Sequence, residues 1–452
     1  YTIMQEYRYV HSNTEATTGY FTCEPHPRPD LGQALLYLQS HPLDSFMRRY
    51  LLTHLVEEDP QSLRTALHDL YPGQDVPAPV SALLEELALL REDYNSLAQE
   101  FPDTGAAQDP DPASPLIFLR WKRLPDRILQ EQWRKLFRDN IRQHKALKRP
   151  GETGLPALYP ASAEALTDDL RLLPGLSSVF TSPFSTHISE LHQESSSKPS
   201  REHPLYVRPP AEETADQAER RLKSLDIIAG SQMRHNASLS PVALLRPWNV
   251  KLVVREDRHE LSLSGKATTY GRGLSLAAAR ASCLMEMVER ASAYLSVEDD
   301  RILHLAEPNE LLHGSRSTIE HTFGPALDPG EYPLEVPYRD APLCWLRGTS
   351  AAGGDVRVPV QMAGLFSNLD EIDLFDSPGS TGIATGNSVE EAKLAALLEV
   401  IERDAEATTP FAKTGCFVLE ADPGQDPLIA RLLDDYKARG INVQFQDITG
   451  PM

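Results

Sequence analysis

Two stretches of the sequence decide the fold: GRGLSLAAARASCLMEMVER, residues 271–290, and TGNSVEEAKLAALLEVIER, residues 385–403. Each has glycine near its start, continues through strong helix formers such as alanine and leucine, and ends on the step Glu-x-x-Glu-Arg. The alignment that places Glu286 over Glu399 also superimposes Gly273 on Gly386, Ser275 on Ser388, Ala279 on Ala392, Leu284 on Leu397, Glu289 on Glu402 and Arg290 on Arg403. The sequence therefore predicts a duplicated loop-helix unit in a pseudo-symmetric fold.

Each predicted helix has an apolar side and an acidic side, because successive residues of an α-helix are rotated by about 100°. In the first helix, the apolar side comprises Leu284, Met287, Val288 and Ala291, and the opposite side carries Ser282, Glu286 and Glu289. In the second helix, the apolar side comprises Leu397, Val400 and Ile401, and the opposite side carries Glu391, Glu399 and Glu402. The simplest interpretation is an amphipathic helix whose acidic side faces water.

The other residues on the acidic sides favour a different interpretation, because they are small. They are Ser275, Ala278, Ala279, Ser282 and Ala293 in the first helix, and Ser388, Ala392 and Ala395 in the second. A solvent-exposed helix face usually carries long polar side chains. Small residues between carboxylates leave room for a bound group to lie close to the backbone.

Two such helices that face each other would gather carboxylates that cannot all ionise without a counter-charge. Mg²⁺ prefers carboxylate oxygens and commonly completes its coordination shell with phosphate oxygens and water. Glycine-rich turns before helix N-termini present backbone N–H groups to phosphate, and the arginine of each step can neutralise phosphate oxygens. The pattern therefore predicts a site for a nucleotide and Mg²⁺.

Each accessory feature also has an ordinary explanation. Ser388 and Glu391 fit the capping-box pattern Ser-x-x-Glu, and Arg290 and Arg403 can pair with carboxylates one turn away. The glycine-rich segments match neither a P-loop nor a dinucleotide fingerprint. A carboxylate-bridged dimetal protein would carry Glu-x-x-His steps on these helices, and neither stretch contains histidine.

Composition excludes several classes of partner. The chain has 452 residues, 41% of them hydrophobic, and a formal net charge of −21 from 65 acidic and 44 basic residues. Such a charge disfavours nucleic acid and anionic membrane surfaces as the main partner. No apolar run is long enough for a membrane span. Four cysteines without a close pair indicate a reduced, cytoplasmic protein.

Patterning divides the chain into three parts. Residues 1–150 are predicted to form a mainly helical domain of unknown role, which starts with a short hairpin in EYRYVHSNTEATTGYFTCEP, residues 6–25. Residues 151–205 lack clear periodicity and contain a Ser/Pro-rich linker. Residues 206–452 mix predicted strands, such as NVKLVV and ELSLSG, with helices, which makes this part α/β or α+β.

From Arg208 to the end, the sequence resembles the YcaO superfamily. The first stretch, residues 271–290, resembles the family's first ATP-binding helix, and residues 380–405 resemble the second, with Gly-Asn followed by a Glu four residues later. The segment PPAEETADQAERRL resembles the usual start of the domain. The resemblance implies a pseudo-symmetric mixed sheet-and-helix fold peculiar to the family, and a domain that Met452 cuts short.

The resemblance also implies which residues hold the cofactors, ATP and Mg²⁺. The ATP-binding residues would be Arg208, Thr214, Ser282, Glu286, Glu289, Asn387, Glu391, Glu399, Glu402 and Arg403. The metal ligands would be Glu286, Glu289, Glu391, Glu399 and Glu402. It assigns no catalytic residue.

Members of the family use ATP to phosphorylate a backbone amide oxygen of a peptide or protein, after which a nucleophile replaces the oxygen. The resemblance thus implies an ATP-dependent amide-activating enzyme for cyclodehydration or thioamidation; amidine formation is a further outcome in the family. The alternative is a non-catalytic nucleotide-binding partner that presents substrate to another modification enzyme, such as a methylthiotransferase. The N-terminal part is a candidate docking surface for a peptide or partner protein, and alanine-rich helices are compatible with a homodimer.

Overall fold

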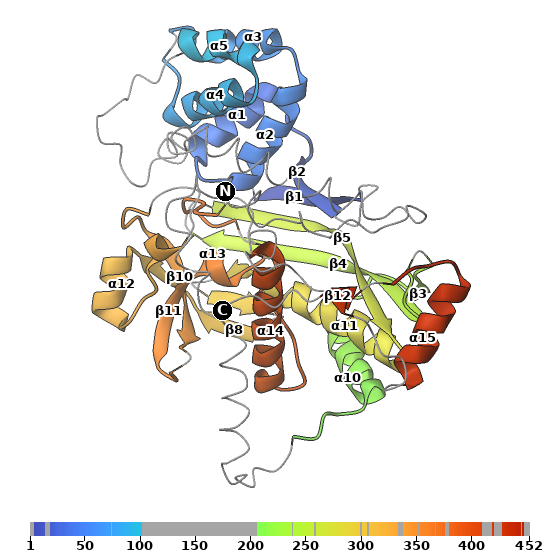
Figure 1. Cartoon of the computed structure of the whole chain (residues 1–452). Helices are drawn as coiled ribbons and strands as arrows, with labels where there is room; N and C mark the ends of the chain where they lie inside the picture. The colour runs from blue at the N-terminus through green and yellow to red at the C-terminus, as the bar shows by residue number, and fades with distance from the viewer. Residues whose placement is uncertain are drawn as a thin grey trace, which may run out of the picture. The chain divides into compact units, whose positions relative to one another are not determined.

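The computed structural model describes residues 4–101 and 206–446, apart from 14–18, 74, 237, 257–258, 299–300, 305–306, 333–337, 351, 367, 376–378, 409–417, 420–426 and 444. The chain forms two compact units, and Figure 1 labels the helices and strands of the described residues. The first comprises Tyr1–Pro125 and Arg208–Lys393, and the second comprises Asp126–Val207 and Leu394–Met452. The irregular region and linker predicted over residues 151–205 lie outside the described residues, and the predicted domain boundaries stay a prediction.

A mixed sheet of eight strands forms the centre of the first unit. Its strands are β1 (Gln5–Asn13), β2 (Gly19–His26), β3 (Met233–Arg234), β4 (Val242–Glu256), β5 (His259–Gly273), β6 (Ser296–Glu298), β7 (Arg301–His304) and β8 (Glu307–Glu310). The order is β2-β1-β5-β4-β6-β7-β8, with β3 beside β4. The predicted hairpin is confirmed, because β1 and β2 pair antiparallel. In addition, β1 runs parallel to β5.

The two longest strands, β4 and β5, form the centre of the sheet. On β4, Val250, Leu252 and Val254 are fully or almost fully buried at alternate positions, as a strand with one face in the core requires. Leu252 lies opposite Leu263 in the antiparallel register. The strands predicted in NVKLVV and ELSLSG are confirmed, but both continue much further than the apolar pattern indicated.

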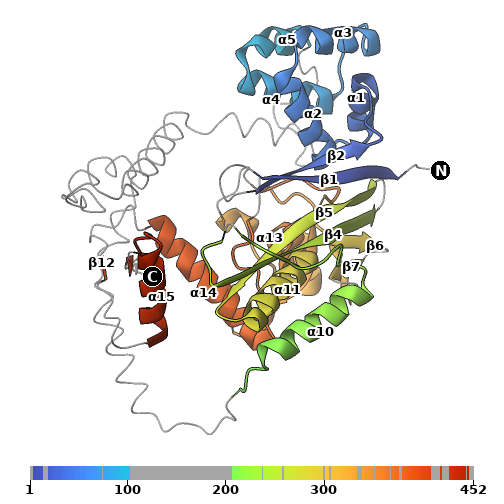
Figure 2. The ribbon, with the colours of Figure 1, turned by 90° about the vertical axis from the view of Figure 1, so that its right-hand side faces the viewer.

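Two helices pack together beside the long strands. Helix α11 (Leu276–Ala293) packs on β5 and β4, and helix α10 (Ala211–Ser224) packs on α11. Figure 2 shows both helices beyond β4 and β5, away from the N-terminal helices. The predicted apolar side of α11 is confirmed at Leu284 and Met287, both of which are fully buried.

The N-terminal part is mainly helical, as predicted. Its helices are α1 (Leu31–Ser40), α2 (Ser45–Glu57), α3 (Pro60–Leu70), α4 (Ala78–Leu90) and α5 (Asn95–Glu100), with a short 3₁₀ turn at Glu92–Tyr94. Asp30, Asp44 and Asp59 cap α1, α2 and α3 by accepting backbone N–H bonds in the first turn. These helices share one apolar core with β4, β5 and α11, so they belong to the same unit as the sheet.

Asp44 ties the N-terminal helices to the rest of the first unit. Its carboxylate is fully buried and accepts hydrogen bonds from Phe46 N and Met47 N at 3.0 Å, Tyr7 Oη and Tyr37 Oη at 2.8 Å, and Asn368 Nδ2 at 3.0 Å. The Asn368 side chain in turn accepts from the backbone N and the Oγ of Ser45. One carboxylate therefore fixes β1, α1, α2 and the segment around Asn368 together.

A small second sheet completes the first unit. It consists of β9 (Leu312–Gly314), β10 (Leu343–Thr349) and β11 (Asp355–Pro359), accompanied by α12 (Arg316–Phe323), α13 (Val360–Ala363) and a 3₁₀ turn at Pro329–Glu331. The predicted strands LCWLRG and DVRVPV are thus confirmed. Trp345, which is fully buried, is the largest side chain of the separate core beneath this sheet.

Helix α14 (Val389–Thr408) begins in the first unit and continues into the second at Leu394. The second unit also contains α15 (Pro427–Ala438) and the short pair β12 (Val418–Leu419) and β13 (Phe445–Gln446). Leu397 and Val400, which the periodicity placed on an apolar side of this helix, are exposed in the structure. Among the described residues, no helix is long and apolar enough to cross a membrane.

A buried carboxyl group makes the stability of the first unit depend on pH. Burial raises the pKa of Glu371 from 4.5 to about 7, although Gln361 Nε2 donates to it at 2.8 Å and the Cys344 backbone N–H also donates to it. Between these pH values the folded protein keeps a proton that the unfolded chain loses. Folding is therefore favoured at low pH and weakens as pH rises through about 7.

We expect this contribution to disappear in Glu371→Gln. The free energy of unfolding of the wild type should fall, relative to that of the variant, by up to about 3 kcal/mol between pH 5 and pH 8. Urea unfolding followed by circular dichroism at the two pH values measures this difference. A difference between wild type and variant that stays constant with pH would show that Glu371 does not titrate in this window.

Candidate nucleotide site

The two glycine-rich segments enter their helices in the same way. Ser275 Oγ accepts the backbone N–H of the residue three positions later at 3.2 Å, and Ser388 Oγ does the same at 3.2 Å. These are the serines that the sequence alignment superimposes. The repeat predicted from the sequence is therefore also present in the structure, as the same cap at the start of each helix.

The aligned glycines also have the same surroundings. A Cβ atom on Gly273 would lie 2.7 Å from the backbone N of Ala279, and one on Gly386 would lie 2.5 Å from the backbone N of Ala392. Each glycine thus brings the chain against the first turn of the following helix. Only a residue without a side chain permits this approach.

Four of the predicted site residues are joined in one network. The Arg208 Nε lies 2.7 Å from Glu391 Oε1, and Asn387 donates to Glu391 Oε2 from its backbone N at 2.9 Å and from Nδ2 at 3.0 Å. Thr214 Oγ1 donates to Asn387 Oδ1 at 2.9 Å. The network joins the segment before α10, the first turn of α10 and the start of α14.

The Glu391 carboxylate is held by this network, and the Glu391 backbone takes part in the cap of α14. Ser388 Oγ caps α14 by accepting the Glu391 N–H, as the pattern predicted. The carboxylate itself accepts hydrogen bonds from the backbone N and the Nδ2 of Asn387. It is mostly buried, with 18% of the side chain exposed, whereas the side chain of Arg208 is 75% exposed.

Glu286 and Glu289 lie together on α11 beside an arginine. Arg290 Nε is 4.0 Å from Glu286 Oε1 and 3.7 Å from Glu289 Oε1, so the pairing within one helix turn is present. Glu286 Oε2 also accepts the backbone N–H of Tyr270 at 2.9 Å. Burial raises the pKa of Glu286, and the Tyr270 N–H and the charges of Arg290 and Arg272 oppose that rise.

The loop that precedes α14 contacts α11 directly. Thr385 Oγ1 donates to the backbone carbonyl of Met285 at 3.1 Å. Ser282, one turn earlier on α11, is exposed. The contact places the second glycine-rich segment next to the helix turn that carries Glu286.

One expectation about the small residues of α11 was wrong. Ala279, which the periodicity placed beside the glutamates, is fully buried, and Ala293 is 4% exposed. The reason is the close approach of β5, because a Cβ on Gly271 would lie 2.1 Å from the carbonyl oxygen of Ala279. Ala279 therefore faces the sheet and leaves no room for a ligand.

An ion-pair cluster that the sequence pattern did not predict holds α10 against α11 and β4. Glu219 on α10 pairs with Arg280 of α11, with Arg246 of β4 at 3.1 Å and with Lys223 at 2.8 Å. The Lys223 hydrogen bond, followed by those of the two arginines, lowers the pKa of Glu219 to about 2. Long-range pairing of this kind has no local signal in the sequence.

The remaining predicted residues belong to the second unit. Glu399, Glu402 and Arg403 follow on α14, where Arg403 Nη1 lies 2.7 Å from Glu406 Oε2. Among the described residues, no group of three or more His, Cys, Asp or Glu side chains converges so that it could hold a metal ion. The donor chemistry still fits, because all five candidate ligands are carboxylates, which Mg²⁺ prefers.

Comparison with known proteins matches the part of the chain that carries the repeat. Residues 270–452 match the family model described as "YcaO cyclodehydratase, ATP-ad Mg2+-binding". An uncharacterized protein of Methanothermobacter thermautotrophicus is 29% identical over 190 residues, which are 41% of this chain and 45% of that protein. The chain thus spans less than half the length of this relative.

Two solved structures are similar to the chain. The YcaO protein from Methanopyrus kandleri bound with AMPPCP and Mg²⁺ is 19% identical, with a TM-score of 0.35 over 51% of this chain and 54% of that one. A heterocyclase in complex with substrate and cofactor is 15% identical, with a TM-score of 0.38 over 56% and 36%. Residues 270–452, which carry the duplicated helix entries, thus match the YcaO family, whose model is described as ATP- and Mg²⁺-binding.

Proposed function

We propose that this protein binds Mg-ATP and activates a backbone amide of a peptide or protein by phosphorylation, for cyclodehydration or thioamidation. The observation that carries the proposal is the network of Arg208, Thr214, Asn387 and Glu391. These residues come from separate segments and are all expected at the nucleotide.

Bound ATP with Mg²⁺ would supply the phosphoryl group that turns an amide oxygen, a poor leaving group, into a good one. We assign Glu286, Glu289, Glu391, Glu399 and Glu402 to hold the metal ions. Thr214, Asn387 and Ser282 would position the nucleotide through hydrogen bonds. Transfer of this kind depends mostly on positioning and charge neutralisation.

The arginines of the site would balance negative charge. Arg208 already neutralises Glu391 across 2.7 Å, and its largely exposed side chain is free to reorient toward phosphate oxygens when a cation binds that carboxylate. Arg403 would act in the same way from α14. We also propose a reducing, cytoplasmic setting for this chemistry; Cys23, Cys283 and Cys344 form no disulfide with one another.

The test is peptide-dependent turnover. Protein incubated with ATP, Mg²⁺ and candidate peptides should release phosphate together with ADP or AMP only when a substrate peptide is present. Glu399→Ala combined with Glu402→Ala should lower the rate at least about 100-fold, because metal ligands would be lost. Phosphate release can be followed by a coupled colorimetric assay.

A full-length protein that binds nucleotide but never turns over would contradict the enzymatic proposal. It would favour a non-catalytic partner that presents substrate to another modification enzyme. Unchanged turnover in the double variant would instead remove Glu399 and Glu402 from the site. The three results are distinct, because binding and phosphate release are measured separately.

A further inference from the structure

Arg280 of α11 joins two carboxylates of the neighbouring helix α10. Its Nη1 donates to Asp216 Oδ1 at 2.7 Å, and its Nη2 donates to Glu219 Oε2. Asp216 and Glu219 are three residues apart, so they lie on the same side of α10. One planar guanidinium therefore holds the helix at two points, which fixes both its rotation and its position along α11. These three residues are called the α10 clamp below.

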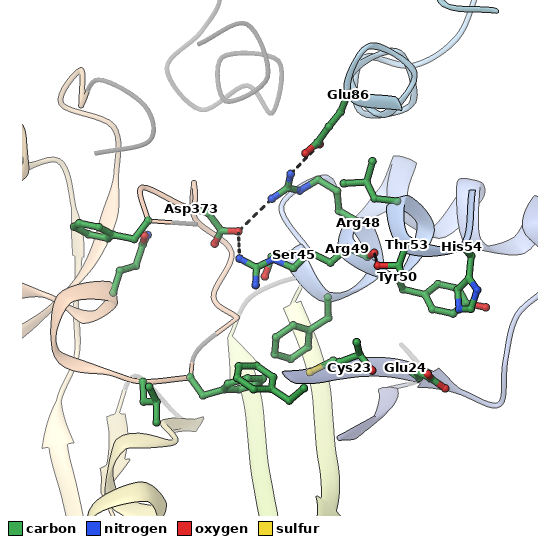
Figure 3. A pocket seen from close by; sticks show the side chains of 18 residues that line it. Cys23, Glu24, Ser45, Arg48, Arg49, Tyr50, Thr53, His54, Glu86 and Asp373 are labelled. Carbon is green, nitrogen blue, oxygen red and sulfur yellow. Dashed lines mark hydrogen bonds and ion pairs between the residues drawn. The ribbon is translucent and has the colours of Figure 1, made fainter. Parts of the chain in front are cut away.

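Arg48 uses its guanidinium in a related way elsewhere in the first unit. Its Nη1 lies 3.1 Å from Glu86 Oε2, and its Nη2 lies 3.4 Å from Asp373 Oδ2 (Figure 3). Those two carboxylates belong to different parts of the chain, α4 and the segment that follows α13, so Arg48 joins separate elements. Both carboxylates bound by Arg280 belong to one helix, and they set the position of that helix.

The apolar contact between α10 and α11 is shallow. The buried residues of α10 are Thr214, Ala215, Ala218 and Leu222, and the first three of these are small. Small side chains form low ridges, which resist the sliding of one helix along another less than interlocked large side chains do. The α10 clamp supplies the constraint that this apolar face lacks.

The position of α10 decides whether Thr214 reaches the candidate nucleotide site. Thr214 lies about 7.5 Å along the helix axis from Glu219, and its Oγ1 donates to Asn387 Oδ1 at 2.9 Å. A slide of about 1 Å would stretch this hydrogen bond beyond its usual limit of about 3.0 Å. At the far end of α10, the backbone N of Asn249 on β4 donates to the Ile227 carbonyl at 2.6 Å. Thr214 lies at the end of α10 that is remote from this anchor.

We propose that Arg280 is a positioning residue of the nucleotide site. Through the α10 clamp it holds Thr214 against Asn387, and Asn387 in turn holds the Glu391 carboxylate. Arg280 acts through α10 and not through contact with the nucleotide. This role rests on the proposed function, because it assigns a further residue to the same site.

Arg280→Gln removes both bonds of the α10 clamp. Calorimetric titration of ATP into the full chain in excess Mg²⁺ should show binding about tenfold weaker than in the wild type, as is typical when a partner behind a ligand is lost. The variant should still fold, because Glu219 keeps Arg246 and Lys223 as partners and is not left as an unpaired buried charge. Urea unfolding of both proteins checks this.

Arg316→Gln is the matched control. The Arg316 guanidinium also lies beside two carboxylates, at 3.3 Å from Glu320 and 3.7 Å from Asp328, and its side chain is 30% exposed against 29% for Arg280. It belongs to α12, beside the small second sheet. This variant should bind ATP within about twofold of the wild type, because its site is independent of the nucleotide network.

A double-mutant cycle separates positioning from a general loss of stability. Thr214→Val removes the hydroxyl that reaches Asn387 and should by itself weaken ATP binding about tenfold. Since Arg280 acts through Thr214, adding Arg280→Gln to this variant should weaken binding less than about twofold further. Independent effects would instead multiply to a loss of about 100-fold.

Asp216→Asn provides a second, milder variant. It removes the more exposed carboxylate of the α10 clamp, with 51% of the side chain exposed, and should weaken binding about threefold. This arm decides the matter if Arg280→Gln does not fold, because unchanged affinity in Asp216→Asn would then count against the clamp.

Three results would overturn this role while ATP still binds to the wild type: unchanged affinity in Arg280→Gln, equal losses in Arg280→Gln and Arg316→Gln, or losses that multiply in the cycle. Each of them leaves the proposed function standing. No ATP binding by the wild type would instead overturn the proposed function and this role with it.

Discussion

We expect Gly271→Ala to destabilise the first unit so strongly that it is largely unfolded. The new Cβ would lie 2.1 Å from the carbonyl oxygen of Ala279 and 2.4 Å from the backbone N of Cys283. Both are backbone atoms of α11, so the clash is relieved only if the helix moves off β5. We expect a loss of about 4 kcal/mol or more in the free energy of unfolding, a large fraction of the stability of a typical domain.

The matched control is Gly73→Ala, where no atom lies within 4 Å of the added Cβ. This variant should unfold within about 1 kcal/mol of the wild type. Urea unfolding monitored by far-ultraviolet circular dichroism compares the three proteins. If both variants were equally stable, the close approach of β5 and α11 would not be needed for folding.

Glu391→Ala is expected to weaken Mg-ATP binding about 100-fold or more. The change removes a proposed metal ligand and leaves Arg208, Asn387 and Thr214 without the group that organises them. Loss of a metal ligand together with its hydrogen-bonded partners typically costs at least one to two orders of magnitude in affinity. Calorimetric titration of ATP in excess Mg²⁺ measures the dissociation constant.

Glu390→Ala separates this effect from the general loss of a negative charge at the start of α14. Glu390 is the preceding residue of the helix, is exposed, and also lies in its first turn. Its replacement should change the dissociation constant less than about threefold. Equal losses in the two variants would mean that Glu391 acts only through the helix dipole.

Local patterns predicted the elements of this fold, but not how they pair. The hairpin near the N-terminus and the helices that carry the two Glu-x-x-Glu-Arg steps were evident from periodicity and glycine positions. The parallel pairing of β1 with β5 was not, because no property of residues 5–13 refers to a strand so distant along the chain. Sheet register between remote segments depends on the complete core.

For the candidate site too, local features could be predicted from the sequence, whereas burial by distant segments could not. Helix periodicity placed Glu391 on the acidic side of its helix, and the resemblance added Asn387, Arg208 and Thr214. Helix periodicity placed Ala279 beside the glutamates, whereas the strand against it decides its burial. Helix periodicity gives the directions of side chains around one helix axis. It does not show which of those side chains a neighbouring strand or helix will bury.

The parallel pairing of β1 with β5 determines when the N-terminal strands and helices can fold during synthesis. Residues 5–9 pair with residues 261–265, so β1 is synthesised long before its partner strand β5. Until then β1 and β2 exist only as a hairpin, which is marginally stable alone in water. The N-terminal helices share their core with the same late strands. Their final packing therefore follows synthesis of the sheet rather than preceding it, unlike a domain that folds as soon as it emerges.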